Sequence, residues 1–213
     1  MAMATVPSAT LRALGRRDPA LAKVMPRLEP CPALPHPAKK RQSHFESLAQ
    51  AIVYQQLAGK AAATIFGRVR ALTPGPRFPK AEELLRLPEA RVRGAGVSAA
   101  KFAALCDLAE RSLDGRLPLR SLGRQDDATV LEELVAIRGI GPWTAQMFLM
   151  FKLGRPDVIA PGDLGLQEGM RRLDRLPQRP SEKELEARAE IWAPYRTIAS
   201  WYLWRLADTG LSE

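Results

Sequence analysis

Apolar residues recur along this chain with a helical period, and Pro and Gly residues interrupt them. The clearest case follows Ser43, where five apolar residues share one face of a 3.6-residue repeat: Phe45, Leu48, Ala49, Ile52 and Val53. Glu46, three residues after Ser43, completes the pattern of a capping box, so a helix should begin there. No stretch alternates apolar and polar residues as a half-buried strand does. The pattern predicts an all-α protein.

Further helices follow from the same reading. Two short ones should open at Ser8 and at Asp18, the second with Pro19 in its first turn. The stretch from Glu29 to Pro37 holds four prolines and is predicted to be a linker. Ser98 and Asp127 are expected to cap two of the later helices. These later helices are expected at residues 60–72, 81–86, 89–93, 98–113, 128–136, 142–153, 164–173, 182–192 and 195–207.

The charge of the chain narrows the class of partner. Its 213 residues carry a net charge of +9, with a pI of about 10.1, which favours a polyanion such as nucleic acid over an anionic membrane. A soluble enzyme with a basic surface is the alternative. Residues 1–45 hold eight Lys and Arg against two acids, and their densest run is Lys39-Lys40-Arg41. That run fits phosphate contacts and a solvated linker equally well.

The chain offers little for metal chemistry. Two cysteines, Cys31 and Cys106, and two histidines, His36 and His44, cannot build a disulfide framework, a zinc site or a four-cysteine cluster. No cofactor is therefore expected. No apolar run reaches the length of a membrane span, and no signal core is visible, so we expect a reduced cytoplasmic protein, associated with the nucleoid if bacterial.

The sharpest local signal lies between Leu131 and Ala145. Gly139 and Gly141 allow a tight turn and close backbone approach, and Pro142 starts the next helix. Such a hairpin presents backbone N–H groups beside a positive helix N-terminus, an arrangement that binds phosphate without charged side chains. An ordinary αα-hairpin is the alternative. The flanking apolar helices and the basic charge favour DNA binding.

The hairpin is one of four sequence blocks that resemble a known family. Residues 137–145 resemble the helix-hairpin-helix of the DNA glycosylase superfamily, and residues 158–166, with Pro161-Gly162-Asp163, resemble the loop that carries its essential aspartate. Residues 51–62 and 192–205 resemble the alkylbase branch, the 3-methyladenine DNA glycosylase II family. Four blocks in the family order, spanning about Phe45 to Arg205, are a specific signature.

The resemblance implies a fold and an activity. It implies the two-lobed, all-α glycosylase fold in its compact form, without an N-terminal β domain. Residues 45–158 would form one lobe, with the helix-hairpin-helix at about 129–153. Residues 1–44 plus 159–213 would form the other, with the active cleft between the lobes. The implied activity is hydrolysis of the N-glycosidic bond of alkylated bases flipped out of duplex DNA, the first step of base excision repair.

Asp163 is the catalytic residue that the resemblance implies. Because it follows Pro-Gly and precedes a helix, its position also predicts an N-cap. Capping and catalysis are compatible, because a carboxylate that accepts helix N–H groups stays ionised and oriented. N-alkylation can make a purine cationic and therefore a good leaving group, so one carboxylate that stabilises an oxocarbenium-like transition state, with or without acting as a base, is sufficient. Asp157 is interpreted as structural.

Trp143 stands where bifunctional relatives carry a nucleophilic lysine, so the resemblance implies a monofunctional enzyme without lyase activity. Lys152 lies on the following helix at the wrong place. Trp143 itself fits the core or the site equally well.

The remaining site residues are also taken from the resemblance. Gln56 is the expected intercalating wedge, with Leu57 second, although Gln55 and Gln56 could simply cap a helix. Trp204 is the expected floor of the base pocket, whereas Trp201 and Tyr202 are assigned to the core. The expected sets are, for the pocket, Trp204, Trp143, Met147 and Tyr54, and for DNA phosphate, Arg138, Gly139, Gly141, Trp143 and Thr144.

Tyr54 and Met147 depart from the family pattern, and so the range of alkylated bases stays open. No metal site is expected, apart from a monovalent ion that the hairpin could hold. The expected partner is double-stranded DNA containing alkylated bases, bound by a monomer with no membrane and no obligate protein partner. The alternatives are a non-catalytic DNA-binding protein on this scaffold and a monofunctional glycosylase for oxidised or mismatched bases.

Overall fold

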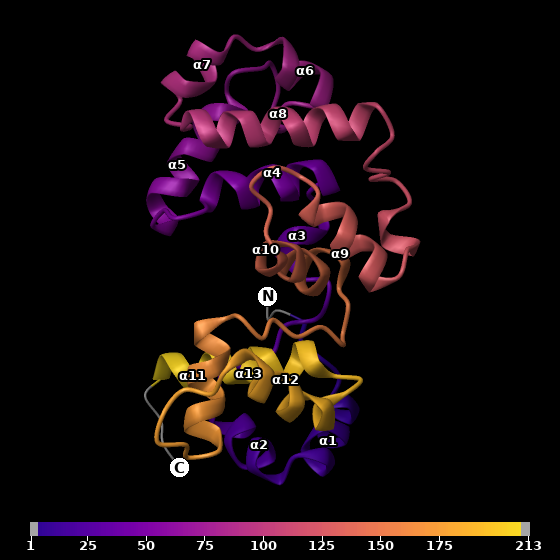
Figure 1. Ribbon diagram of the computed structural model, residues 1–213, viewed down its shortest axis with the longest axis vertical. Helices are drawn as coiled ribbons and strands as arrows, with labels where there is room; N and C mark the ends of the chain where they lie inside the picture. Colours follow the sequence, from indigo (N-terminus) through magenta and orange to yellow (C-terminus); the bar gives the residue numbers. More distant parts are fainter. Residues whose placement is uncertain (1–3, 210–213) are drawn as a thin grey trace. The chain divides into compact units, whose positions relative to one another are not determined.

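The computed structural model describes residues 4–209, and these residues are helical, as the sequence pattern predicts (Figure 1). Within the described range no strand forms, and the one β-type contact is an isolated antiparallel bridge between Thr5 and Pro32. None of the described helices is long and apolar enough to span a membrane.

The described chain divides into two compact units. Arg41–Phe148 form the first, called here the hairpin unit; the residues before and after it form the second, called the aspartate unit. The chain therefore crosses after Phe148, earlier than the expected crossing after Val158. Two hydrogen bonds join the segment after Phe148 to the N-terminal segment. The N–H of His36 donates to the carbonyl of Phe151, 3.0 Å away. The ammonium of Lys152 donates to the carbonyl of Lys39 at 2.8 Å.

The hairpin unit has α8 at its centre, packed against α4, α6 and α7 (Figure 1). The first five helices of the unit are α4 (His44–Tyr54), α5 (Gly59–Arg70), α6 (Ala81–Arg86), α7 (Glu89–Gly94) and α8 (Ala99–Leu113). The expected apolar face of α4 is buried. Ser43 caps α4 by accepting the N–H of Glu46, but the Glu46 carboxylate pairs with Arg70 instead of completing a capping box.

The rest of the hairpin unit carries the hairpin itself. It comprises η2 (Leu122–Arg124), α9 (Asp127–Val135), α10 (Pro142–Met147) and the start of the π-helical turn η3 (Phe148–Leu153). The expected single helix over 142–153 is thus α-helical only in its first half. Asp126, not Asp127, caps α9, because its carboxylate accepts the N–H of Thr129. Two acidic residues in succession could not be separated as caps by sequence alone.

The aspartate unit joins helices from both ends of the chain. The N-terminal elements are α1 (Ser8–Arg17), α2 (Pro19–Val24), η1 (Met25–Arg27) and α3 (Pro37–Lys40), the last beginning at Pro37, where the expected linker ends. The C-terminal elements are α11 (Leu164–Leu173), α12 (Glu182–Ala189), η4 (Glu190–Trp192) and α13 (Arg196–Thr209). α11 and α13 pack most extensively, and Gly169 lets them approach because any Cβ there would collide with the backbone of Leu203.

Candidate functional site

Asp163 lies at the N-terminus of α11 in the aspartate unit, where the sequence placed it. Its backbone N–H donates to the carbonyl of Ala160 at 3.0 Å, which closes the preceding turn. Its Oδ1 accepts the N–H of Leu166 at 2.8 Å, so the carboxylate caps the helix. Gln167 is buried and donates from Nε2 to the carbonyl of Pro161 at 2.9 Å. The loop before Asp163 is therefore fastened to the helix after it.

Trp204 on α13 contacts the same carboxylate. Its indole Nε1–H donates to Oδ1 of Asp163 at 2.9 Å, across 41 residues of sequence. The ring of Phe151 lies 5.9 Å from the Trp204 ring, centroid to centroid, at an interplanar angle of 37°. The sequence reading gave Trp204 a role only through its ring face; the structure adds a hydrogen bond that orients the carboxylate.

Gly165 makes room for this contact, and the sequence reading missed it. A Cβ at Gly165 would lie 3.0 Å from Oδ1 of Asp163 and 3.0 Å from Cδ1 of Trp204, closer than nearly all real Cβ contacts. A side chain at position 165 would therefore press directly on the hydrogen-bonded pair. The Gly at the second position of α11 was visible in the sequence, but its partner on α13 was not.

Asp157 is engaged elsewhere, in line with its structural interpretation. Arg196 donates to it from Nε at 2.8 Å and from Nη2 at 2.9 Å, and the N–H of Arg196 adds a third bond at 3.2 Å. Although burial raises the pKa of Asp157, the hydrogen bonds from Arg196 outweigh that effect and leave the pKa below its ordinary value. Asp157 thus anchors the start of α13.

The hairpin in the hairpin unit turns at Gly139, whose φ of +76° is in the left-handed region that glycine adopts freely. The N–H of Ile140 donates to the carbonyl of Ile137 at 3.0 Å and closes the turn. Gly141 precedes α10 without a side-chain cap, and Trp143 is 50% exposed, so Trp143 is not a core residue.

Not every backbone donor of the hairpin is offered to a ligand. The N–H of Arg138 donates to Oδ2 of Asp107 at 2.7 Å, so this donor is engaged within the protein. Thr144, one of the expected phosphate contacts, is buried at 7% exposure, whereas Arg138, Gly139 and Gly141 are exposed.

The turn that follows α4 carries the expected wedge residues. Gln56 is exposed and has a φ of +55°, which is unusual for a residue with a side chain, and Leu57 is 39% exposed. The amide of Gln55 does not cap α4. It donates to the carbonyl of Gly139 at 2.8 Å and so ties this turn to the hairpin.

The other expected pocket residues are half-buried, and their contacts with a base stay predictions. Tyr54 packs edge-on against Phe66, with ring centroids 6.2 Å apart, and Met147 ends α10. Tyr202 is buried as expected, but Trp201 lies nearer the surface, with Arg205 over its ring at 4.9 Å and its Nε1–H on the carbonyl of Glu29.

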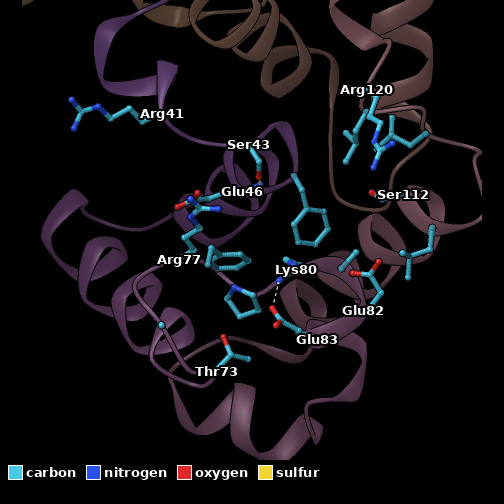
Figure 2. A pocket seen from close by; sticks show the side chains of 18 of the residues that line it. Arg41, Ser43, Glu46, Thr73, Arg77, Lys80, Glu82, Glu83, Ser112 and Arg120 are labelled. Carbon is cyan, nitrogen blue, oxygen red and sulfur yellow. Dashed lines mark hydrogen bonds between the residues drawn. The ribbon is translucent and has the colours of Figure 1, made fainter.

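A hollow of about 830 Å³ also lies in the hairpin unit (Figure 2). Its lining includes Ser43 and Phe45 at the start of α4, whereas Gln56 follows the end of that helix. Among the residues that line the hollow are the cationic Arg77, Lys80 and Arg120 and the aromatic Phe45 and Phe78. None of the expected site residues contributes to it, so its size does not make it the candidate active site. Among the described residues, no cluster of three or more His, Cys, Asp or Glu could hold a metal ion.

Comparisons with known proteins show which family the chain resembles. A model of the HhH-GPD superfamily of base excision DNA repair proteins matches residues 49–194. The chain is 37% identical over 178 residues to DNA-3-methyladenine glycosylase 1 of Schizosaccharomyces pombe, covering 82% of this chain and 78% of that relative.

Two solved structures extend the likeness to the fold. A DNA-3-methyladenine glycosidase from Bacillus halodurans is similar with a TM-score of 0.86 and 37% identity, covering 99% of this chain and 94% of that one. A 3-methyladenine DNA glycosylase from Schizosaccharomyces pombe, solved in complex with abasic DNA, is similar with a TM-score of 0.78 and 33% identity, covering 93% and 95%.

Proposed function

Since the chain belongs to the HhH-GPD superfamily of base excision DNA repair proteins, we propose that it is a monofunctional DNA glycosylase that hydrolyses the N-glycosidic bond of alkylated bases. The observation that carries the proposal is the carboxylate of Asp163, fixed by two N–H donors from different helices. The relatives named for 3-methyladenine supply the substrate class.

The chemistry follows from what a fixed carboxylate can do. As the bond to the base lengthens, positive charge develops on the sugar, and a negative charge held beside it lowers the barrier. Leu166 and Trp204 hold Asp163 before the reaction begins, so little reorganisation is needed in the transition state. An alkylated purine that is already cationic departs without a general acid. A water molecule then adds to the sugar, and its proton is released.

DNA is bound in this proposal through the hairpin and the turn after α4. The backbone around Gly139 and Gly141 contacts phosphate, which positions the duplex without reading its sequence. Gln56 and Leu57 enter the space that the flipped nucleotide leaves. The protein acts as a monomer, and a monovalent ion at the hairpin stays a prediction.

The absence of lyase activity is part of the same proposal. A lyase needs an amine that attacks the sugar, and the position after the hairpin that would supply it holds Trp143. The ammonium of Lys152 donates to the carbonyl of Lys39, in the N-terminal segment of the same unit. Borohydride trapping on alkylated duplex DNA should therefore give no covalent protein–DNA adduct, while free base is still released.

The decisive experiment compares Asp163→Asn with Asp157→Asn. Asparagine keeps an oxygen that can cap α11 and accept from Trp204, so the fold should persist while the charge is lost. We expect single-turnover release of alkylated base, identified by mass spectrometry, to fall at least about 100-fold in Asp163→Asn, or roughly 2.7 kcal/mol in barrier. Binding to duplex DNA should stay within about twofold of the unmodified protein.

Asp157→Asn is the matched control because it removes the same charge six residues away. It should lower stability through Arg196 but leave the excision rate within about threefold. An Asp163→Asn protein that retains more than about a tenth of the activity contradicts the proposed role of Asp163. A wild-type protein that binds DNA and releases no base supports the alternative of a non-catalytic DNA-binding protein. A protein that releases only oxidised or mismatched bases supports the alternative of a glycosylase for those lesions.

A further inference from the structure

One face of α8 contacts both parts of the hairpin unit that are proposed to meet DNA. Lys101, Ala104 and Asp107 recur at three-residue spacing and so lie along one side of the helix. Lys101 reaches the turn after α4, Ala104 packs beneath Gly139, and Asp107 accepts the N–H of Arg138. We call these three residues the α8 platform.

Lys101 closes the C-terminus of α4, where backbone carbonyls lack partners within the helix. Its ammonium donates to the carbonyl of Val53 at 2.8 Å and to that of Gln55 at 2.7 Å. A cation at this end also complements the helix dipole. Burial lowers the pKa of Lys101 below its ordinary value, because the partly buried ammonium loses contact with water.

The turn that Lys101 holds contains an uncommon backbone conformation. Gln56 has the left-handed φ of +55° that side-chain-bearing residues avoid. The flanking Gln55 is fixed twice, by Lys101 on its carbonyl and through its own amide on the carbonyl of Gly139. The residue that precedes the strained Gln56 is therefore held by two hydrogen bonds, while Gln56 and Leu57 remain exposed.

The hairpin is attached to the same helix. A Cβ on Gly139 would lie 3.4 Å from the Cβ of Ala104, so the turn of the hairpin rests on this side chain. Asp107 accepts the N–H of Arg138 at 2.7 Å and is itself held by Arg111. Because α8 is a continuous helix of 15 residues, the two ends of the platform keep a fixed separation.

We propose that Lys101 is a positioning residue, which acts through Gln55 to preset the turn at residues 55–57 against the hairpin, so that intercalation and phosphate binding occur on one duplex without reordering the turn. This inference rests on the proposed function of that turn and deepens it. A loop ordered before binding loses less conformational entropy when it inserts, so the effect should appear at base flipping rather than at first contact.

The test compares Lys101→Met, which keeps the aliphatic stem, with Lys101→Arg, which keeps donors for the two carbonyls. Lys183→Met, at an exposed position on α12, controls for the loss of one positive charge. Three quantities are measured: affinity for undamaged duplex, single-turnover excision at saturating protein, and the fluorescence of 2-aminopurine placed opposite a tetrahydrofuran abasic analogue, which reports on insertion of the turn.

For Lys101→Met we expect excision and the 2-aminopurine response to fall about tenfold, with affinity for undamaged duplex within about twofold of Lys183→Met. Lys101→Arg should recover most of the excision rate and most of the 2-aminopurine response. Gln55→Leu, which removes only the link to Gly139, should show the same split and keeps the proposal testable if Lys101→Met does not fold. Wild-type behaviour in Lys101→Met, or equal losses in excision and undamaged binding, overturns the proposal.

The abasic analogue separates this inference from the proposed function. It contains no base to release, so the fluorescence response is read without any excision. If the unmodified protein releases no alkylated base, the proposed function fails, while a normal fluorescence response that depends on Lys101 still supports the platform.

Discussion

The Oδ1 atom of Asp163 accepts two hydrogen bonds, one from its own helix and one from α13. Because the two donors lie on different helices, their effects on the carboxylate can be tested separately. The bond from Leu166 is local and would form at any aspartate that caps a helix. The bond from Trp204 comes from another helix and fixes the rotation of the carboxylate toward α13. The second bond therefore separates an oriented carboxylate from a simple cap.

Trp204→Phe tests this orientation, because phenylalanine keeps an aromatic face and removes the N–H. We expect single-turnover excision to slow by about tenfold, or ~1.4 kcal/mol, for cationic and neutral lesions alike. Trp204→Ala should in addition slow cationic lesions more than neutral ones, since a cation over an indole face gains about 1–2 kcal/mol. Thermal unfolding must be measured beside the rates because truncation of a half-buried Trp also destabilises the fold.

Gly165→Ala serves as the companion variant, since its Cβ would crowd both Asp163 and Trp204 without altering either side chain. It should reproduce the rate loss of Trp204→Phe. A wild-type rate in Trp204→Phe would show that the N–H is dispensable and that the helix cap alone orients the carboxylate.

The sequence predicted the position of Asp163 but not its surroundings. Its place after Pro-Gly and before a helix is a local signal that predicts an N-cap, as observed, whereas its catalytic role was taken from the family resemblance and stays a prediction. Trp204 was predicted only as the aromatic floor of the base pocket. Its hydrogen bond to Asp163 depends on the packing of α11 against α13, which no local pattern encodes. The alternative that Gln55 simply caps a helix stayed open for the same reason: the acceptor of its side-chain amide, the carbonyl of Gly139, lies 84 residues away.

At the scale of elements, the hairpin depends on a carboxylate outside itself. Asp107 on α8 accepts the N–H of Arg138 and is held by Arg111 through both of its oxygens. The conformation that Gly139 permits is therefore selected by a neighbouring helix. An acidic residue here works against the affinity of a basic protein for DNA, so a structural role explains its presence better than a binding role.

Asp107→Ala should accordingly weaken DNA binding even though it makes the protein more basic. We expect affinity for damaged and undamaged duplex to fall together, by about three- to tenfold, because a loosened hairpin contacts phosphate less well. Asp107→Asn should lose less, since its amide oxygen still accepts from Arg138. The measurement is fluorescence anisotropy at fixed salt.

Asp114→Ala, at the exposed end of the same helix, controls for charge and should leave binding unchanged or slightly tighter. If Asp107→Ala also tightens binding, long-range electrostatics outweigh the anchoring and the structural role of Asp107 is wrong.

Helix positions were largely predictable because apolar periodicity and capping residues are local signals. Ser98 caps α8 and Asp18 caps α2, as expected. The errors occur where tertiary contacts choose between similar local options: Asp126 in place of Asp127 as a cap, and a π-helical turn at 148–153 in place of a continued α-helix. Within that turn, Phe151 and Lys152 bond the N-terminal segment through their carbonyl and ammonium groups.

At the scale of the whole chain, the aspartate unit joins two segments that are far apart in sequence. Asp18, 2% exposed, accepts from Nε1 of Trp192 at 2.7 Å and from Nη2 of Arg188 at 2.7 Å. Arg188 in turn pairs with Asp174. The family match begins only at residue 49, so this buried cluster lies partly outside the part of the chain that the family model covers.

The buried cluster around Asp18 should make the free energy of unfolding depend on pH in acid. Burial raises the pKa of Asp18, but hydrogen bonds from Trp192, Leu21 and Arg188 outweigh it, so the folded pKa lies below the ordinary value of 3.8. A carboxyl whose pKa is lowered by folding stabilises the folded state fully above its unfolded pKa, and that contribution is lost as the pH falls through the folded pKa. The stabilisation by Asp18 should therefore be complete at pH 7 and decline below about pH 4.

Asp18→Asn should reduce the free energy of unfolding by about 2–3 kcal/mol at pH 7, because an amide replaces a carboxylate that Trp192 and Arg188 both contact. Urea unfolding of the variant and the unmodified protein at pH 7, 5 and 3 gives the difference directly. It should be constant between pH 7 and 5 and shrink toward pH 3, where the native carboxyl begins to protonate. Excision per folded molecule at pH 7 should be unchanged, since Asp18 caps α2 and does not contact Asp163. A difference that stays constant down to pH 3 would mean that packing, rather than the charge of Asp18, joins the two ends of the chain.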